Sequence, residues 1–172
     1  MPSPFAALER LAAVSRRWWP LPLRLIVGYG FMAHGWAKLA RGPGRFTEIL
    51  AALHLPHPAF AAWLTIGFEL AGGLAVLLGL CIPAFGVPMA VILITAIVTV
   101  HLPNGFSSIK LQSVTAAGAH FGQPGYETDL LYLAALVSLA LGGPGPLALG
   151  RARPPRRPGT AGRAASGRSS AG

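Results

Sequence analysis

The sequence contains a single cysteine, Cys81, and few charged residues. One cysteine excludes an internal disulfide bond and every metal or redox motif that needs a pair of cysteines. Charged residues make up 11% of the 172 positions, less than half of their share in an ordinary soluble domain, and only five residues are acidic. Apolar residues make up 53%. This composition is typical of an integral membrane protein.

Four apolar stretches are long enough, or nearly long enough, to cross a bilayer, which takes about 20 residues of helix. Backbone groups in hydrocarbon must be hydrogen-bonded within the segment, so we expect each stretch to be helical. Two tryptophans precede the first stretch, and a Gly- and Pro-rich segment ends the last. The sequence therefore predicts an all-α integral membrane protein, a four-transmembrane-helix bundle with spans at about residues 21–39, 59–80, 84–102 and 128–143.

The segments outside the spans differ in character. Residues 41–58 carry Phe46, Ile49, Leu50 and Leu53 at helical spacing, which predicts a short interfacial helix. Residues 103–126 are polar and show no clear period. The sequence thus divides into an N-terminal cytoplasmic or interfacial segment (1–20), the transmembrane domain (21–149) and a basic tail expected to be disordered (150–172).

The net charge of +9 is concentrated at the two ends of the chain, with four arginines in the first 24 residues and six after residue 150. Basic flanks mark the cytoplasmic side of membrane spans, so with four spans both termini are expected to be cytoplasmic. These arginines flank apolar spans instead of lining one folded face, which argues against nucleic acid as a partner. The expected partner is the lipid bilayer.

Several polar residues lie inside or at the edges of the spans, where charge is costly and usually faces the bundle interior. His34 and Lys38 are four positions apart and share a helix face. Glu69 shares its face with Gly72 and Gly73, small residues that let a neighbouring helix approach closely. At 1.5 Å per residue, the polar positions all fall in the outer half of the bilayer. We expect helix packing to gather five of them into one site: His34, Lys38, Glu69, His101 and Glu127, with Asp129 close behind.

Simpler interpretations exist for most of these residues. Lys38 is also compatible with snorkelling to the outer interface, His34 with a hydrogen bond between helices, and His101 and Glu127 with ordinary loop-edge positions. Glu69 is the strongest functional candidate, because a carboxylate in the middle of a span must be protonated or paired. No spacing of ligating residues predicts a metal site.

Several short motifs follow one another between about residues 21 and 149. They are Arg24, Gly28, His34-Gly35 and Lys38; Glu69, Gly72-Gly73 and Leu77-Leu78-Gly79; His101 to Phe106; Gly125-Tyr126-Glu127; and Gly143-Pro144-Gly145. The order and spacing of these motifs resemble the DoxX family of bacterial membrane proteins. The resemblance departs from the family where Pro146-Leu147-Ala148-Leu149 replaces a Ser and Asp.

The resemblance implies a multi-pass protein of the bacterial inner membrane with a link to membrane oxidoreductases. The related DoxD proteins form part of a thiosulfate:quinone oxidoreductase, and other relatives are tied to thiol and oxidative-stress defence or to quinone handling. The sequence has no Gly-rich nucleotide fingerprint, so electrons would have to come from a redox protein partner or another cofactor.

Three functions fit the sequence. In the first, the protein is an oxidoreductase subunit in which Glu69, His34 and His101 bind a quinone headgroup or relay its protons, with Lys38 and Glu127 completing the polar site. A haem held by His34 and His101 is a less favoured variant. The second is a small proton-coupled transporter, working as a homo-oligomer because four helices are few for a carrier. The third is a non-catalytic membrane anchor or assembly subunit.

Overall fold

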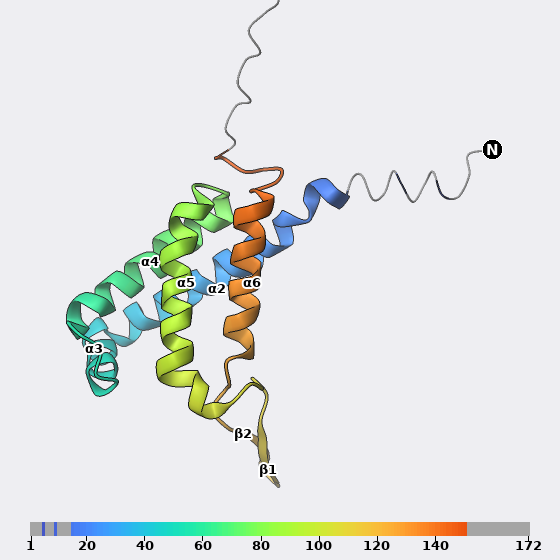
Figure 1. The fold of residues 1–172 in the computed structure, drawn as a ribbon. Helices are drawn as coiled ribbons and strands as arrows, with labels where there is room; N and C mark the ends of the chain where they lie inside the picture. Colours follow the sequence, from blue (N-terminus) through green and yellow to red (C-terminus); the bar gives the residue numbers. More distant parts are fainter. Residues whose placement is uncertain (1–4, 6–8, 10–14, 151–172) are drawn as a thin grey trace, which may run out of the picture.

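The structure is a computed structural model that describes residues 5, 9 and 15–150. Most of the predicted N-terminal segment and nearly all of the predicted basic tail lie outside these residues. The described chain is mostly helical, and its helices and strands are drawn in Figure 1. They are α2 (Pro20–Arg41), α3 (Pro43–Ala52), α4 (Pro58–Leu78), α5 (Ile82–Ala96), a π-helix (Ile97–His101), a 3₁₀ turn (Leu102–Asn104), β1 (Leu111–Thr115), β2 (Gly118–Phe121) and α6 (Glu127–Gly142).

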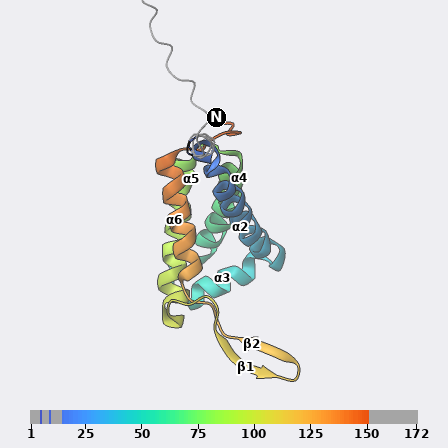
Figure 2. The same cartoon turned by 90° about the vertical axis from the view of Figure 1, so that its right-hand side faces the viewer.

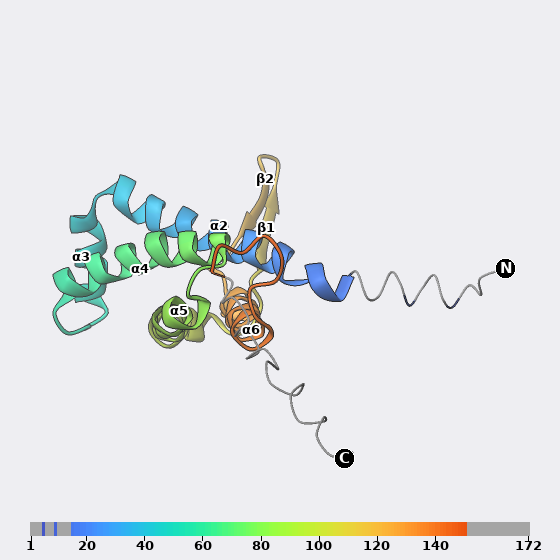
Figure 3. The same cartoon turned by 90° about the horizontal axis from the view of Figure 1, so that it is seen from above.

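Helices α2 and α4 form an antiparallel pair that is joined by α3 and lies side by side along its length (Figure 3). Glycines let the two backbones touch. A Cβ atom on Gly28 would lie 2.7 Å from the carbonyl oxygen of Gly73, and a Cβ on Gly73 would lie 2.7 Å from that of Gly28. In a bilayer the hydrophobic effect does not drive helices together, so they associate through the close van der Waals packing that small residues permit.

Helices α5 and α6 form a second antiparallel pair, which crosses the first at a steep angle; Figure 3 looks along α5 and α6 while α2 and α4 run across the view. Pro83 stands in the first turn of α5, where its missing N–H costs nothing, and Pro88 lies inside the helix. Past Ala96 the helix widens into a π turn, since the Leu102 N–H donates to the carbonyl of Ile97, five residues back.

The core lies where the two pairs meet. It contains Val27 and Phe31 from α2, Val76 from α4, Met89 from α5 and Leu139 from α6, all at most 3% exposed. The outside is also apolar, because each of the four long helices exposes large hydrophobic side chains. Such side chains on an outer surface are what contact with lipid requires. Among them are Leu25, Trp36, Phe60, Trp63, Val87, Val91, Leu131 and Leu141.

The connections collect at two opposite ends. The start of α2, the α4–α5 turn and the segment after α6 share one end (Figure 1), whereas α3 and a β-hairpin lie at the other (Figure 2). The hairpin pairs β1 with β2 antiparallel, with Thr115 opposite Gly118 and a bulge between Leu111 and Ser113, and all its residues are exposed. The predicted short helix in residues 41–58 is confirmed as α3, but the hairpin was not predicted from the sequence.

The four long helices coincide with the four predicted spans to within a few residues at most ends. Two of them, Pro58–Leu78 and the continuous stretch Ile82–Asn104, are long and apolar enough to cross a membrane. Helix α6 has only 16 residues, and α2 carries Arg24 and Lys38 within its length. Crossing by these two helices, and the cytoplasmic placement of both termini, therefore remain predictions.

Candidate functional site

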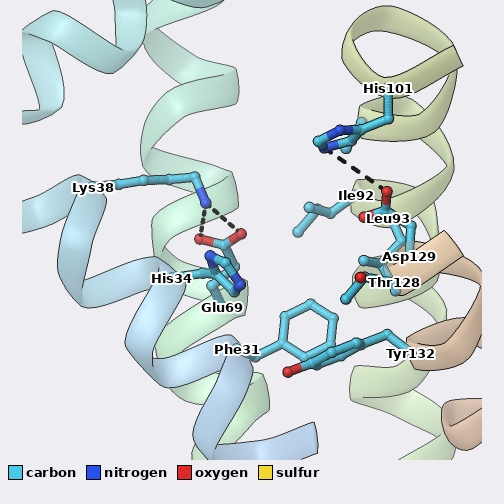
Figure 4. A pocket seen from close by; sticks show the side chains of 11 residues that line it. Phe31, His34, Lys38, Glu69, Ile92, Leu93, His101, Thr128, Asp129 and Tyr132 are labelled. Atoms are coloured by element: carbon cyan, nitrogen blue, oxygen red, sulfur yellow. Dashed lines mark hydrogen bonds and ion pairs between the residues drawn. The ribbon is translucent and has the colours of Figure 1, made fainter. Parts of the chain in front are cut away.

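A cavity of about 150 Å³ lies between the α2/α4 pair and the α5/α6 pair. Figure 4 shows two facing walls: α2 and α4 contribute one, and α5, the π-helix and α6 contribute the other. The lining combines apolar and aromatic side chains with a few polar ones, as binding sites for small molecules usually do. The lining residues are Phe31, His34, Lys38, Glu69, Ile92, Leu93, Ala96, His101, Thr128, Asp129 and Tyr132.

The first wall carries a closed ion pair between α2 and α4. The Lys38 ammonium donates to both carboxylate oxygens of Glu69, at 2.6 Å and 2.7 Å. The two side chains are 24% and 5% exposed, respectively. Gly35 permits this approach, because a Cβ at that position would lie 3.0 Å from the Cβ of Glu69. The ammonium also lies 5.3 Å from the ring centre of Phe46 on α3, so Lys38 faces the bundle instead of reaching for the interface.

His34 lies one helical turn before Lys38 on α2 and lines the same cavity. In Figure 4 its ring stands beside the Glu69 carboxylate, on the side toward Phe31. The i, i+4 spacing that predicted a shared face for His34 and Lys38 therefore holds in the structure.

The opposite wall carries a looser acid–base pair between the π-helix and α6. His101 Nε2 lies 3.8 Å from Asp129 Oδ2, beyond hydrogen-bond distance, and the two side chains are 23% and 15% exposed. The other ring nitrogen, Nδ1, lies 3.2 Å from the carbonyl oxygen of Pro124. A carbonyl can only accept, so this contact assigns the ring hydrogen to Nδ1, whose N–H donates to the Pro124 carbonyl.

The π turn determines where the His101 ring points. An extra residue in one turn rotates everything beyond it by about 100° relative to an α-helix. Two hydroxyls supply further donors to backbone carbonyls near this change of register: Thr95 donates to Val91 at 2.8 Å, and Thr99 donates to Thr95 at 2.7 Å. Single π turns inside α-helices occur frequently at functional sites.

Two aromatic rings close the end of the cavity that lies deepest in the bundle. Phe31 and Tyr132 meet edge to face, with ring centres 5.6 Å apart and planes at 74°. The Tyr132 hydroxyl lies against Gly30, where any side chain would collide with it. Gly30 therefore provides the space that the Tyr132 hydroxyl occupies beside α2.

Glu127 does not line the cavity. Its Oε2 accepts the backbone N–H of Ser108 at 3.0 Å, and the Ser108 hydroxyl lies 2.8 Å from that of Thr128. These contacts fasten the loop before the hairpin to the first turn of α6. Of the five residues predicted to converge, the structure brings together four, namely His34, Lys38, Glu69 and His101, and leaves Glu127 at the rim.

Two further residues of the cavity are Asp129 and Tyr132, which the sequence pattern does not identify as central to the site. Asp129, expected only to lie near the site beside Glu127, is the acid that faces His101. Tyr132 lies three positions after Asp129 on the same helical face, and this spacing is the signal by which it could have been found. No cluster of His, Cys, Asp and Glu within the described residues could hold a metal ion.

Arg24 forms a second polar centre at the opposite end of α2. It is 2% exposed, and its guanidinium donates to five backbone carbonyls. Nε donates to Val76 (3.2 Å); Nη1 donates to Pro144 and Pro146 (both 3.0 Å); Nη2 donates to Leu77 (2.7 Å) and Leu147 (3.4 Å).

All five N–H groups of the Arg24 guanidinium are therefore used, which ties the end of α4 to the segment that follows α6. The acceptors at the α4 end are C-terminal helix carbonyls, which carry the negative end of the helix dipole. Sequence reasoning treated Arg24 as a flanking charge and as part of a family motif, and missed this role.

Comparison with known proteins gives concordant results. The profile of the DoxX family matches residues 19–102. The chain is 34% identical over 137 residues to the uncharacterized membrane protein Rv3486 of Mycobacterium tuberculosis, covering 75% of this chain and 77% of that protein. It is 37% identical over 86 residues to CatD of Bacillus subtilis, named as a candidate oxidoreductase, covering 50% of this chain and 62% of CatD. No solved structure matches significantly. The chain therefore belongs to the DoxX family of membrane proteins.

Proposed function

We propose that the protein crosses the bacterial inner membrane four times, with both termini in the cytoplasm. The charges of α2, which would oppose insertion, are compensated inside the protein: Lys38 is paired with Glu69, and every N–H of Arg24 is hydrogen-bonded. The Arg24 end is also the end at which the start of α2, the α4–α5 turn and the post-α6 segment meet. The arginine-rich sequence at the termini favours the cytoplasm for that end.

We propose further that the protein is a subunit of a membrane oxidoreductase system and that its cavity receives a quinone headgroup. The observation that carries this proposal is that each of the two facing walls holds one acid–base pair: Lys38–Glu69 lies on the first wall and His101–Asp129 on the second. A cavity of about 150 Å³ has the volume that accommodates a single six-membered ring. The ring of a quinone presents an oxygen at each of two opposite ends, which suits polar groups on two facing walls.

The cavity residues have separate roles in binding the ring and in exchanging its protons. Lys38 and His34 offer donors to a ring oxygen on the first wall, and Glu69 keeps the ammonium in place. At the other end, His101 Nε2 accepts a hydrogen bond from the hydroxyl of the reduced ring, while Phe31 and Tyr132 bound the ring plane. A quinone supplies the two-electron, two-proton chemistry; the chain's own residues bind the ring, orient it and exchange its protons. Electrons pass to or from a separate redox protein.

The test uses the purified protein in lipid nanodiscs. Quinone is extracted and quantified, and a short-chain hydroquinone is titrated by calorimetry. We expect one bound ring per chain, with a dissociation constant raised about twofold to tenfold in His101→Gln, because one hydrogen bond between uncharged groups is worth about 0.5–1.5 kcal/mol. Glu48→Gln, an exposed carboxylate on α3, serves as the control. Neither bound quinone nor quinone-dependent redox activity, alone or with co-purified partners, would refute the proposal.

A structural role is the second candidate, favoured by the fact that the Lys38–Glu69 pair links two helices. In that case the polar cluster holds an anchor or assembly subunit together. Glu69→Gln separates the two functions. A variant that accumulates in the membrane but binds the ring more weakly supports the oxidoreductase; a variant that fails to accumulate supports the structural role.

A further inference from the structure

The two pairs that face the cavity differ in how far their hydrogen-bonding capacity is used. On the first wall, one ammonium engages both carboxylate oxygens of Glu69 within 2.7 Å. In this short, charge-assisted pair both carboxylate oxygens are engaged and the ammonium keeps one N–H for a ligand, whereas transferring a proton within the pair would leave a buried group without its partner. On the second wall, the closest approach of His101 and Asp129 is 3.8 Å, so each still has an unused hydrogen-bonding position.

The tautomer of His101 shows which atom is open. Because Nδ1 donates to the Pro124 carbonyl, the neutral ring presents a bare Nε2 to the cavity and to Asp129. A bare nitrogen and an ionised carboxylate are both acceptors, so they face each other stably only when a proton or a donor group lies between them. The gap of 3.8 Å leaves that position accessible from the cavity.

We propose that His101, positioned by Asp129, is the proton-exchanging residue of the cavity, and that Lys38–Glu69 is a fixed anchor for the bound ring. This inference rests on the proposed function for the identity of the ring. His101 Nε2 accepts a proton from a ring hydroxyl: the O–H bond breaks, an N–H bond forms, and the charge of the new imidazolium is balanced by the Asp129 carboxylate. The ring oxygen retains the electron pair, and the reverse transfer protonates it.

The surroundings of His101 favour a proton route toward the end of the molecule that holds the hairpin. His101 is partly exposed, and its partner Pro124 belongs to the connection between β2 and α6. The ionisable groups that face it are Asp129 and Tyr132 from α6, His34 and Lys38 from α2, and Glu69 from α4. Lys38 and Glu69 neutralise each other, so Asp129 is the uncompensated charge nearest to the ring.

Histidine-selective ¹⁵N NMR tests the proposal on the full chain in nanodiscs, since the sequence has only five histidines. His101→Gln assigns the signal. In the neutral form we expect hydrogen on Nδ1 and a bare Nε2. In Asp129→Asn the ligand-free His101 Nε2 signal should shift, because a neutral amide replaces the carboxylate that lies 3.8 Å from that nitrogen. Glu48→Gln should leave the signal unchanged. A neutral form with hydrogen on Nε2, or an Nε2 signal that is the same in Asp129→Asn as in the wild type, would overturn the proposal.

A second arm uses a short-chain hydroquinone as the probe. At saturation it should move the His101 Nε2 signal from the position of a bare nitrogen toward that of an N–H, and the shift should persist in Glu69→Gln at a raised hydroquinone concentration. A shift that disappears in Glu69→Gln even at saturation would assign the exchange to Glu69 and refute the division of roles. Failure of hydroquinone to bind would instead refute the proposed function, while the ligand-free Nε2 signal and its response to Asp129→Asn still decide whether Asp129 positions His101.

Discussion

Replacement of Lys38 with methionine removes the cation from the buried pair while preserving most of the side-chain volume. At the observed 2.6 Å and an effective dielectric constant of about 20, the Coulomb attraction in the pair is about 6 kcal/mol, part of which offsets the desolvation of both groups. Removing one partner leaves Glu69 buried and uncompensated. We expect the free energy of unfolding to fall by about 3 kcal/mol, near the lower end for buried pairs, because Lys38 is about a quarter exposed.

The assay is reversible unfolding in mixed micelles, followed by circular dichroism. Two further variants make the result specific to the pair. Lys110→Met, which removes the chain's other lysine from the loop before β1, should change the free energy of unfolding by less than about 0.5 kcal/mol. The double variant Lys38→Met/Glu69→Leu should recover to within about 1 kcal/mol of the wild type, because an apolar pair has no charge to desolvate. A loss below about 1 kcal/mol for Lys38→Met alone would contradict the reasoning.

Three other perturbations test separate parts of the structure. Arg24→Lys offers three N–H donors where the guanidinium uses five, so it should lower the free energy of unfolding by about 3 kcal/mol. It should also speed proteolysis of the segment that follows α6. An unchanged cleavage rate would contradict the role of Arg24 in binding the backbone carbonyls of that segment. Gly28→Ala should cost about 3 kcal/mol because its Cβ meets the α4 backbone, whereas Gly67→Ala, with open space around it, should be neutral or stabilising by up to about 1 kcal/mol. Deleting the exposed Val98 should convert the π turn into continuous α-helix and leave His101 facing the cavity, because the deletion removes the one extra residue that the turn contains. The effect of quinone on the His101 NMR signal should therefore persist, and its loss would contradict this account of the turn.

The helices and half of the site follow from short-range patterns in the sequence. Apolar length located the four long helices, and the spacing of Phe46 and its apolar neighbours located α3. The i, i+4 spacing of His34 and Lys38 placed them on one face. Glycines beside Glu69 indicated that another helix would pack against it, and the structure has Lys38 at that contact.

Other features depend on contacts that the local sequence does not encode. The placement of His101 depends on a single extra residue in a helical turn, which hydrophobic length cannot detect. Arg24 binds carbonyls 52 to 123 positions away, and backbone acceptors leave no mark in the sequence. The β-hairpin turns through Ala116 and Ala117, without the Asn-Gly or Asp-Gly pair that signals such a turn.

The central claim is that a redox-active ring occupies the cavity between the two acid–base pairs. Photoaffinity labelling with an azido-quinone in nanodiscs, followed by peptide mass spectrometry, tests it most directly. We expect the label on peptides that contain cavity-lining residues of α2 and of the π-helix or α6, with labelling suppressed by excess unlabelled quinone and weakened in His101→Gln. Label spread over the lipid-facing surfaces of α4 and α5, unaffected by competitor, would contradict the account.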